Sequence, residues 1–370
     1  MKTAAIVGSD GGVSFAAEGF QEALTRIGEN TGNALFQRAV WNLLPGPKFS
    51  AGPGLMSPNT VRQIADVLVI PAANQINPDF KMDVWADYVE AVDLPCLVVG
   101  LGAQSNDPNL APEQLALPDG VKRFANAISS RSKTIGVRGD FTKKVLASMG
   151  ITNTEITGCP SQTLNKRVSG AQIAERIHAF PSKQNPTVAL LAGTLQDYTR
   201  RTENILYSTV SPIENHTVIY QTDKNILRFI HDRALNDNAR EFFSFMRNVV
   251  RPDLNSDGFF HYLGKRGRFF SDARSWIDAM STVDLAIGMR IHGAMAAIQA
   301  GRLGVCVAFD SRTLELAKTM GVPYILAENI EDGATIESLI EFINFDPKDF
   351  DNKRSKNIAS IDSIIQIAMQ

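Results

Sequence analysis

The stretch IGMRIHGAMAAIQAG, residues 287–301, contains the pattern that decides the fold. Its first letters end a short apolar run that is typical of a buried strand, and the small and apolar letters after Arg290 are typical of a helix packed on a sheet. Gly301 stands where such a helix would end, a position that glycine favours. The pattern therefore predicts a strand, an arginine at its carboxyl end, and a helix that returns along the sheet.

Two other segments repeat this order of strand, arginine, helix and glycine. They are IGVRGDFTKKVLASMGI at 135–151 and FDSRTLELAKTMGV at 309–322. Alternation of strands and helices along a chain favours parallel sheets with crossover helices, an α/β fold. Strands are expected at residues 4–7, 67–70, 97–99, 134–137, 154–156, 187–193, 216–221, 284–288, 304–309 and 323–326.

The chain of 370 residues is too long for one hydrophobic core, since single cores stop growing near roughly 250 to 300 residues. We expect a Rossmann-like domain over residues 1–180 and a second one over 187–345. The segment 346–370 is expected to be a polar connector, to about residue 356, followed by a helix that needs a domain to lie on. The predicted architecture is two α/β domains.

Composition excludes several classes of partner. The net charge of −2, from 37 basic and 39 acidic residues, does not suit nucleic-acid binding. Three widely separated cysteines suit a reducing cytoplasm, and neither cysteines nor histidines show metal-ligand spacing, so no metal is expected. No run of about 18 apolar residues or signal peptide stands out. We expect a cytoplasmic protein without a transmembrane segment, with peripheral contact at the cytoplasmic face of the membrane left open.

The three strand-end arginines, Arg138, Arg290 and Arg312, suggest an anion site. In open parallel sheets, ligands bind beyond the carboxyl ends of the strands, where helix N-termini add N–H groups and partial positive charge. The planar guanidinium can hold a carboxylate or phosphate through two parallel hydrogen bonds. The alternative for each arginine is an ion pair with a nearby acid: Asp140, Asp310 or Glu315.

His292 stands two residues after Arg290 at the start of the same helix, so both are expected to face one crevice. An imidazole there is a candidate acid or base. Cys159, in TGCPS, has nothing beside it in the sequence that marks an activated thiol, and a small buried residue is the simpler interpretation. The Gly8–Gly12 loop lacks phosphate-loop spacing. The segment 264–270 is expected to be a basic surface loop.

The segments IGVRGDFTKKVLASMGITNTEITGCPS and DLAIGMRIHGAMAAIQAGRLGVCVAFDSRTLELAKTMGVP together resemble the polysaccharide pyruvyl transferases, which make pyruvate ketals on sugars from phosphoenolpyruvate. The resemblance is strongest over residues 134–161 and 284–325. Weaker echoes are NTGN at 30–33 and LVVGLGAQ at 97–104. The combination of Arg-x-His-Gly with its following helix and the upstream Arg-Gly segment carries the resemblance.

The resemblance implies a fold of GT-B type, with a cleft between two Rossmann-like domains and a C-terminal helix that returns to the first domain. It also implies that Arg138, Arg290, Ile291 and His292 bind the donor, with His292 and Arg290 as the catalytic candidates. Arg312 is a further donor-binding candidate, at a place where many relatives carry lysine. Phosphoenolpyruvate would be the donor substrate, with no other cofactor.

The implied function is transfer of the enolpyruvyl group to a hydroxyl pair of a sugar, in a polysaccharide or its lipid-linked precursor, as in exopolysaccharide or capsule biosynthesis of the cell envelope. The second domain would bind the donor, and the first would contribute Arg138 and the acceptor side, whose residues stay unassigned. Two alternatives remain. One is a GT-B nucleotide-sugar glycosyltransferase or epimerase in which Glu315 touches ribose, and the other is a non-catalytic anion-binding protein.

Overall fold

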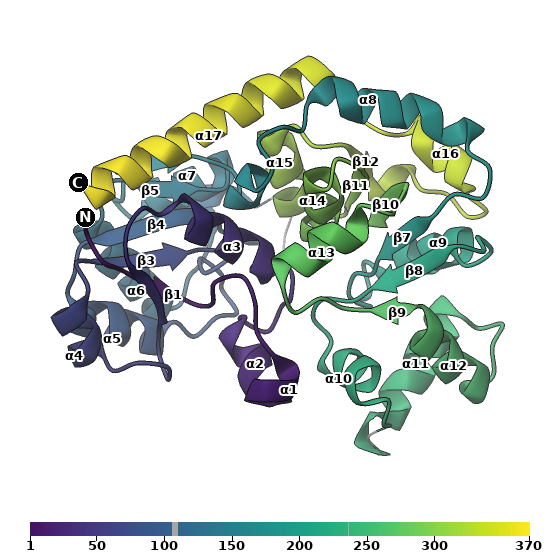
Figure 1. The fold of residues 1–370 in the computed structure, drawn as a ribbon, viewed down its shortest axis with the longest axis horizontal. Helices are drawn as coiled ribbons and strands as arrows, with labels where there is room; N and C mark the ends of the chain where they lie inside the picture. The colour runs from purple at the N-terminus through teal and green to yellow at the C-terminus, as the bar shows by residue number, and fades with distance from the viewer. Residues whose placement is uncertain (106–109, 236) are drawn as a thin grey trace.

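Two six-stranded parallel sheets organise the chain in the computed structural model (Figure 1). The structure describes residues 1–105, 110–235 and 237–370. Every pairing between neighbouring strands in the two sheets is parallel, as crossover helices require. The predicted α/β class with two Rossmann-like domains is confirmed, and the cleft and returning C-terminal helix of the GT-B arrangement are present.

The first sheet has the strand order β2-β1-β3-β4-β5-β6. Its strands are β1 (Ala4–Val7), β2 (Lys48–Ala51), β3 (Val67–Pro71), β4 (Cys96–Leu101), β5 (Ile135–Val137) and β6 (Thr154–Ile156). The helices of this half are α1 (Phe15–Glu18), α2 (Phe20–Arg26), α3 (Asn33–Leu43), α4 (Pro58–Ile64), α5 (Asp83–Val92), α6 (Asp119–Arg131), α7 (Asp140–Ser148) and α8 (Gly170–Ala179). The order reverses between β1 and β3, and such a reversal opens a crevice at the carboxyl ends of the two strands.

The second sheet has the order β12-β11-β10-β7-β8-β9, with its reversal between β7 and β10. Its strands are β7 (Val188–Leu191), β8 (His216–Ile219), β9 (Gly267–Arg268), β10 (Leu285–Gly288), β11 (Leu303–Ala308) and β12 (Tyr324–Leu326). The helices are α9 (Arg200–Val210), α10 (Lys224–Asp232), α11 (Arg240–Val250), α12 (Ser256–Arg266), α13 (Ala273–Met280), α14 (Ile291–Gln299), α15 (Ser311–Met320), α16 (Ile336–Glu341) and α17 (Pro347–Met369). None of the helices in the described residues combines the length and apolar character needed to cross a bilayer.

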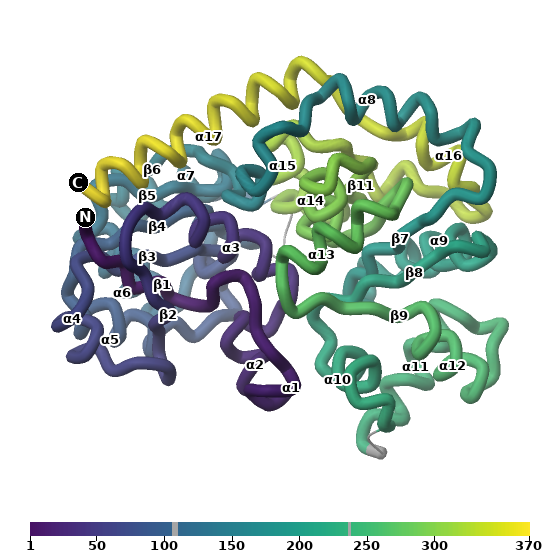
Figure 2. The backbone as a smooth tube through the Cα atoms, in the orientation of Figure 1, coloured from purple at the N-terminus to yellow at the C-terminus, as the bar shows by residue number. Residues whose placement is uncertain are grey.

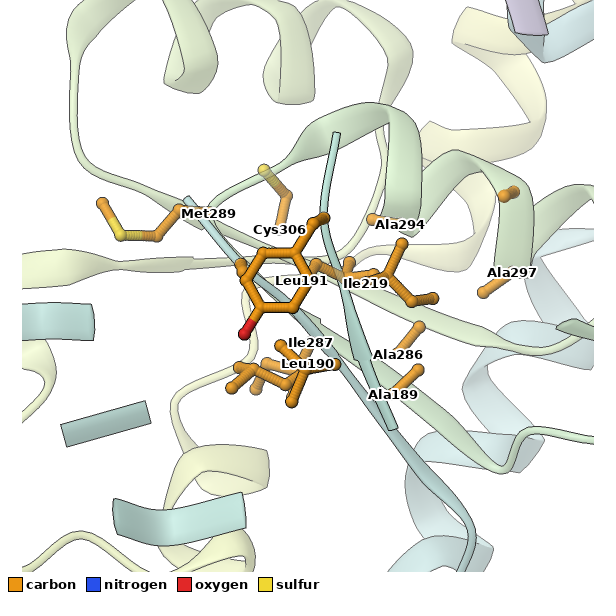
Figure 3. Close-up of a cluster of buried hydrophobic side chains, with 14 of the residues drawn as sticks. Ala189, Leu190, Leu191, Ile219, Ala286, Ile287, Met289, Ala294, Ala297 and Cys306 are labelled. Atoms are coloured by element: carbon orange, nitrogen blue, oxygen red, sulfur yellow. The ribbon is translucent and has the colours of Figure 1, made fainter. Parts of the chain in front are cut away.

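Helix α14 is held tightly against its sheet, as its small side chains predict. Every residue from His292 to Gln299 is buried. Gly304 on β11 allows the close approach, because a Cβ there would collide with the Ala294 carbonyl oxygen. Figure 3 shows Ala294 and Ala297 of the helix with Leu191 and Ala286, which lie on the face of the sheet that the helix covers. The first turn of α14 therefore has a fixed position above the sheet.

Helix α17 joins the two halves by running from the second domain back along the first, where both chain termini lie (Figure 2). The segment 346–356, expected to be a polar connector, is helical from Pro347 onward. Asp346 caps the helix by accepting from the Lys348 and Asp349 N–H groups, at 2.8 and 2.9 Å. The helical start was missed because inward-facing residues stand among its polar letters. One of them, Arg354, is buried and donates to the backbone carbonyls of Gln162, Asn165 and Val168 before α8.

Three further details depart from expectation. The edge strands β2 and β9 have no apolar run of their own and were not predicted. The expected basic loop at 264–270 is instead the end of α12 followed by β9. Helix α8, which falls within the residues expected for the first domain, packs against β11 of the second. For β2 and β9 the neighbouring strand supplies the stability that the local letters lack.

Candidate functional site

A cavity of about 1190 Å³ lies between the two sheets. Both reversal points open into it, through Gly8 after β1 and Asn74 after β3 in the first domain, and through Met289 after β10 in the second. The five residues predicted to bind the donor all line this one cavity: Arg138, Arg290, Ile291, His292 and Arg312. The structure thus brings them together, and their roles remain predictions.

Three strand ends position the three arginines, which we call the arginine cluster. Arg138 follows β5, Arg290 follows β10, and Arg312 lies in the first turn of α15 after β11. Because the carboxyl ends of the strands in both sheets open on the same cavity, residues from distant parts of the chain converge there. The predicted strand-end placement accounts for this convergence.

Arg138 is only 5% exposed, yet it has no ion-pair partner in the described residues. Its Nε donates to the Gly100 carbonyl at 2.9 Å and its Nη1 to the Asn74 Oδ1 at 2.9 Å. Burial, reinforced by the nearby Arg312, lowers the pKa of Arg138. Asp140, the acid considered as its partner, pairs with Lys144 at 2.6 Å instead. Neutral acceptors hold the Arg138 side chain without cancelling its charge.

Arg290 is held in a similar way, by a hydroxyl group. Its Nη2 donates to Thr222 Oγ1 at 2.7 Å, and its buried Nε has no hydrogen-bond partner within the described part of the chain. Burial lowers its pKa to about 10, although Glu203 acts in the opposite direction. Burial also raises the pKa of Glu203 to about 7, so this carboxyl is only partly ionised at neutral pH.

Arg312 alone fits the ion-pair alternative. Its Nη2 lies 3.4 Å from Asp310 Oδ2, while its Nη1 donates to Gln104 Oε1 of the first domain at 2.8 Å. With two of the three arginines unpaired among the described residues, the cavity carries excess positive charge. An anion that enters it gains charge-assisted hydrogen bonds without having to displace a carboxylate from those two arginines.

His292 is 7% exposed, at the first turn of α14. Burial, together with the repulsion of the imidazolium by Arg138, Arg312 and Arg290, lowers its pKa to about 3. The imidazole is therefore neutral at pH 7 when no anion is bound. A bound dianion would offset the repulsion from the arginine cluster but would leave the cost of burial.

Cys159 contacts His292, a contact that the sequence analysis did not predict. It is buried as expected, but its Sγ lies 3.5 Å from Nε2 of His292. The hydroxyl of Ser161 donates to the same sulfur at 3.2 Å. Cys159 and His292 lie 133 positions apart, so their neighbours in the sequence give no sign of the contact.

Glu315, considered above as a ribose ligand, is used in a contact between the domains. Its Oε1 accepts from the Phe141 N–H at 2.5 Å, at the start of α7. Gly139 makes room for the Glu315 side chain, since a Cβ at Gly139 would collide with the carboxyl group of Glu315. The N-terminus of α7 is thus already occupied by a carboxylate, as that of α15 is by Asp310, whereas no side chain in the described part of the chain caps α14.

Gln221 is a site residue that the sequence analysis missed. It is 2% exposed and lines the cavity, and its buried Nε2 has no hydrogen-bond partner among the described residues. The backbone carbonyl of Gln221 accepts from the N–H of Thr31, in the NTGN segment, at 2.9 Å, and this bond connects the two domains beside His292. The signal that could have found it is the strand-end rule, because Gln221 follows β8.

One comparison with known proteins decides the family. The family model described as polysaccharide pyruvyl transferase matches residues 21–311. The chain belongs to the polysaccharide pyruvyl transferase family. The matched residues of this family member include Arg138, Arg290 and His292. No curated protein matches the chain in sequence.

Solved structures resemble this pyruvyl transferase family member in fold. UDP-GlcNAc 2-epimerase of Methanocaldococcus jannaschii is 13% identical with a TM-score of 0.45, over 98% of this chain and 99% of that one. Anabaena HepE, in complex with UDP, is 11% identical with a TM-score of 0.39, over 100% and 94%. A Streptococcus pneumoniae accessory secretory protein is 12% identical with a TM-score of 0.37; the match covers 84% of this chain but only 56% of that one. At such identities the likeness concerns the fold alone.

The buried neutral His292 predicts a pH dependence of stability. The unfolded chain binds a proton at His292 below its ordinary pKa of 6.5, whereas the native protein does not until about pH 3. The free energy of unfolding should therefore fall as the pH drops from 6.5 toward 3, by at most about 1.4 kcal/mol per pH unit from this group.

Glu203 opposes this trend. Its pKa is raised to about 7 in the native protein, so the native state takes up a proton at a higher pH than the unfolded chain does, and the free energy of unfolding rises as the pH falls from about 7 to 4.5. Comparing the wild type with His292→Gln by urea denaturation at pH 6.5, 5.5 and 4.5 separates the two groups. The variant should lose less stability than the wild type over this range. Parallel pH profiles for the two proteins would contradict a buried neutral histidine.

Proposed function

We propose that the chain transfers the enolpyruvyl group of phosphoenolpyruvate to two hydroxyls of a sugar, in a polysaccharide or its lipid-linked precursor at the cytoplasmic face of the membrane. The observation that carries this proposal is the cavity in which Arg138 and Arg290 lie beside His292 without ion-pair partners in the described residues. A donor with a carboxylate and a phosphate on one carbon matches several fixed guanidinium groups.

The proposed reaction assigns a role to each group. A proton adds to the methylene carbon of the enol, a sugar hydroxyl adds to the neighbouring carbon, and the bond from that carbon to the phosphate oxygen then breaks. The second hydroxyl closes the ketal ring, and its proton leaves with the phosphate. The arginine cluster would hold the donor anion and stabilise the departing phosphate, and His292 would exchange protons with the methylene carbon and the hydroxyl.

The cavity volume supports a site for donor and acceptor together. Pockets that bury one drug-sized ligand usually measure roughly 300 to 1,000 Å³. At about 1190 Å³, this cavity can hold the small donor and sugar units of an acceptor at once. Its lining includes Glu22, Arg26 and Trp85 of the first domain as well as the arginine cluster.

Ligand-dependent stability and phosphate release test the proposed function. Phosphoenolpyruvate at about 100 times its Kd should raise the free energy of unfolding by about 2.7 kcal/mol, while a uridine diphosphate sugar should not. Phosphate release from phosphoenolpyruvate should then require a sugar acceptor, which a panel of glycans with free hydroxyl pairs would identify. Stabilisation by the nucleotide sugar alone would favour the glycosyltransferase or epimerase alternative. Stabilisation by phosphoenolpyruvate without phosphate release across the panel would favour a binding protein.

A further inference from the structure

We propose, on the basis of the function proposed above, that Cys159 gives His292 the proton that His292 passes to the methylene carbon of the donor. The geometry that points to this relay is a buried line of three groups that ends at the cavity. Ser161 Oγ donates to Cys159 Sγ at 3.2 Å, and this sulfur lies 3.5 Å from His292 Nε2. His292 in turn lines the cavity.

The hydrogen-bond pattern assigns the proton positions in this line. Since the sulfur already accepts from Ser161, the thiol proton is free to point at Nε2 of His292. A neutral imidazole carries one proton, so an accepting Nε2 leaves that proton on Nδ1. Nδ1 has no hydrogen-bond partner in the described residues, and the ring borders the cavity. His292 thus presents an N–H donor to the ligand while remaining neutral.

The relay answers a difficulty in using His292 alone as the acid. Its pKa of about 3 leaves almost no imidazolium at neutral pH, and a neutral imidazole does not release a proton unless another one replaces it. A thiol is a suitable source, because thiols ordinarily ionise near pH 8.5. Arg138 interacts electrostatically with Cys159 and would stabilise the thiolate that forms.

The first step balances within this line of groups. The electron pair of the enol double bond takes the proton from Nδ1, so a C–H bond forms as the Nδ1–H bond breaks. At the same time Nε2 takes the thiol proton, so an N–H bond forms as the S–H bond breaks. The ring stays neutral, the negative charge lies on Cys159 beside Arg138, and the donor carbon becomes electrophilic.

The second step returns the proton to Cys159. After the first step, Nδ1 has a free lone pair, which suits it to accept the proton of the first sugar hydroxyl. That hydroxyl oxygen bonds to the electrophilic carbon while Nε2 gives its proton back to the thiolate. The relay is restored before phosphate leaves. Cys159 acts only through His292 and is therefore a positioning residue, not one that touches the substrate.

Two variants separate proton supply from a simple hydrogen bond. Cys159→Ser keeps a donor toward Nε2 but replaces the thiol with a far weaker acid, and Cys159→Ala removes the donor. Both should lower kcat roughly 10²-fold or more, with the Kd for phosphoenolpyruvate within about threefold of wild type. Cys96→Ser, at a buried cysteine of β4 away from the cavity, is the matched control and should retain wild-type kcat.

Near-normal turnover in the Cys159 variants would contradict the relay. If Cys159→Ser turns over within threefold of wild type, the contact is a hydrogen bond only and the relay is wrong. A Cys159→Ala variant with wild-type kcat would overturn it as well. Phosphoenolpyruvate titration and a cooperative thermal melt show whether each variant is folded, so that a loss of kcat is not mistaken for misfolding.

A measurement without turnover distinguishes failure of the relay from failure of the proposed function. Nitrogen-15 NMR of His292 in the free wild-type protein should show a protonated Nδ1 and a bare Nε2. Loss of this preference is expected in Cys159→Ala. A protonated Nε2 in the wild type would overturn the relay whatever the reaction is. Absence of phosphate release by the wild type with every acceptor would contradict the proposed function, while the NMR signal would still report on the pair.

Discussion

Replacing His292 with alanine should lower kcat by roughly 10² to 10⁴-fold, the usual cost of losing a general acid or base. The expected loss arises because, in the proposed reaction, the imidazole exchanges protons beside the arginine cluster, while the arginines proposed to hold the anion remain. The Kd for phosphoenolpyruvate should change little or improve slightly. Phosphate release under saturating acceptor and calorimetric titration of the donor would measure the two effects separately.

The control for this variant is an exposed histidine outside the cavity. His178 lies on the outer part of α8, and His178→Gln should retain wild-type turnover and donor affinity. Near-normal kcat in His292→Ala would remove His292 from the mechanism, and the Cys159 relay with it. A large loss of donor affinity with unchanged kcat would instead make His292 a binding residue.

Replacing Arg290 with methionine should weaken binding of phosphoenolpyruvate by about 2 to 5 kcal/mol, the range for a desolvated charge contact that loses one partner. Its guanidinium has Thr222 as a neutral partner, and the nearby Glu203 is only partly ionised, so its charge is available to an anion. Arg290→Lys should recover only part of the affinity, because an ammonium group lacks the planar fork.

Calorimetric titration of the donor would measure these affinities, with Arg123→Met as the control. Arg123 pairs with Asp87 and Glu90 on the surface of α5 and α6, away from the cavity. Arg138→Met should weaken the donor to a similar extent, but it also leaves the acceptors at Gly100 and Asn74 unpaired. Unchanged donor affinity in both the Arg138 and Arg290 variants would contradict the proposed donor site.

Alternation of strand and helix patterns along the chain predicted the α/β class and the parallel sheets, and the small letters after Arg290 predicted the packing of α14 on its sheet. The reason is local: side-chain periodicity and the position of glycine report on which elements a segment can form. The rule that ligands bind at the carboxyl ends of parallel strands then predicted that Arg138, Arg290 and Arg312 would converge. Edge strand β9 was missed because its stability comes from pairing with β8. The start of α17 was missed because its buried residues stand among polar letters, although Asp346 and Pro347 give a local signal for a helix start.

The sequence by itself therefore determined the fold class and the convergence of three arginines at one cavity, since both follow from periodicity and chain direction. Only the tertiary structure decided how each group behaves there. It leaves Arg138 without a carboxylate partner in the described residues, turns Glu315 to the start of α7, and sets Cys159 against His292. Charge balance, desolvation and proton position depend on atoms within a few ångströms, and those atoms come from residues far apart in the chain.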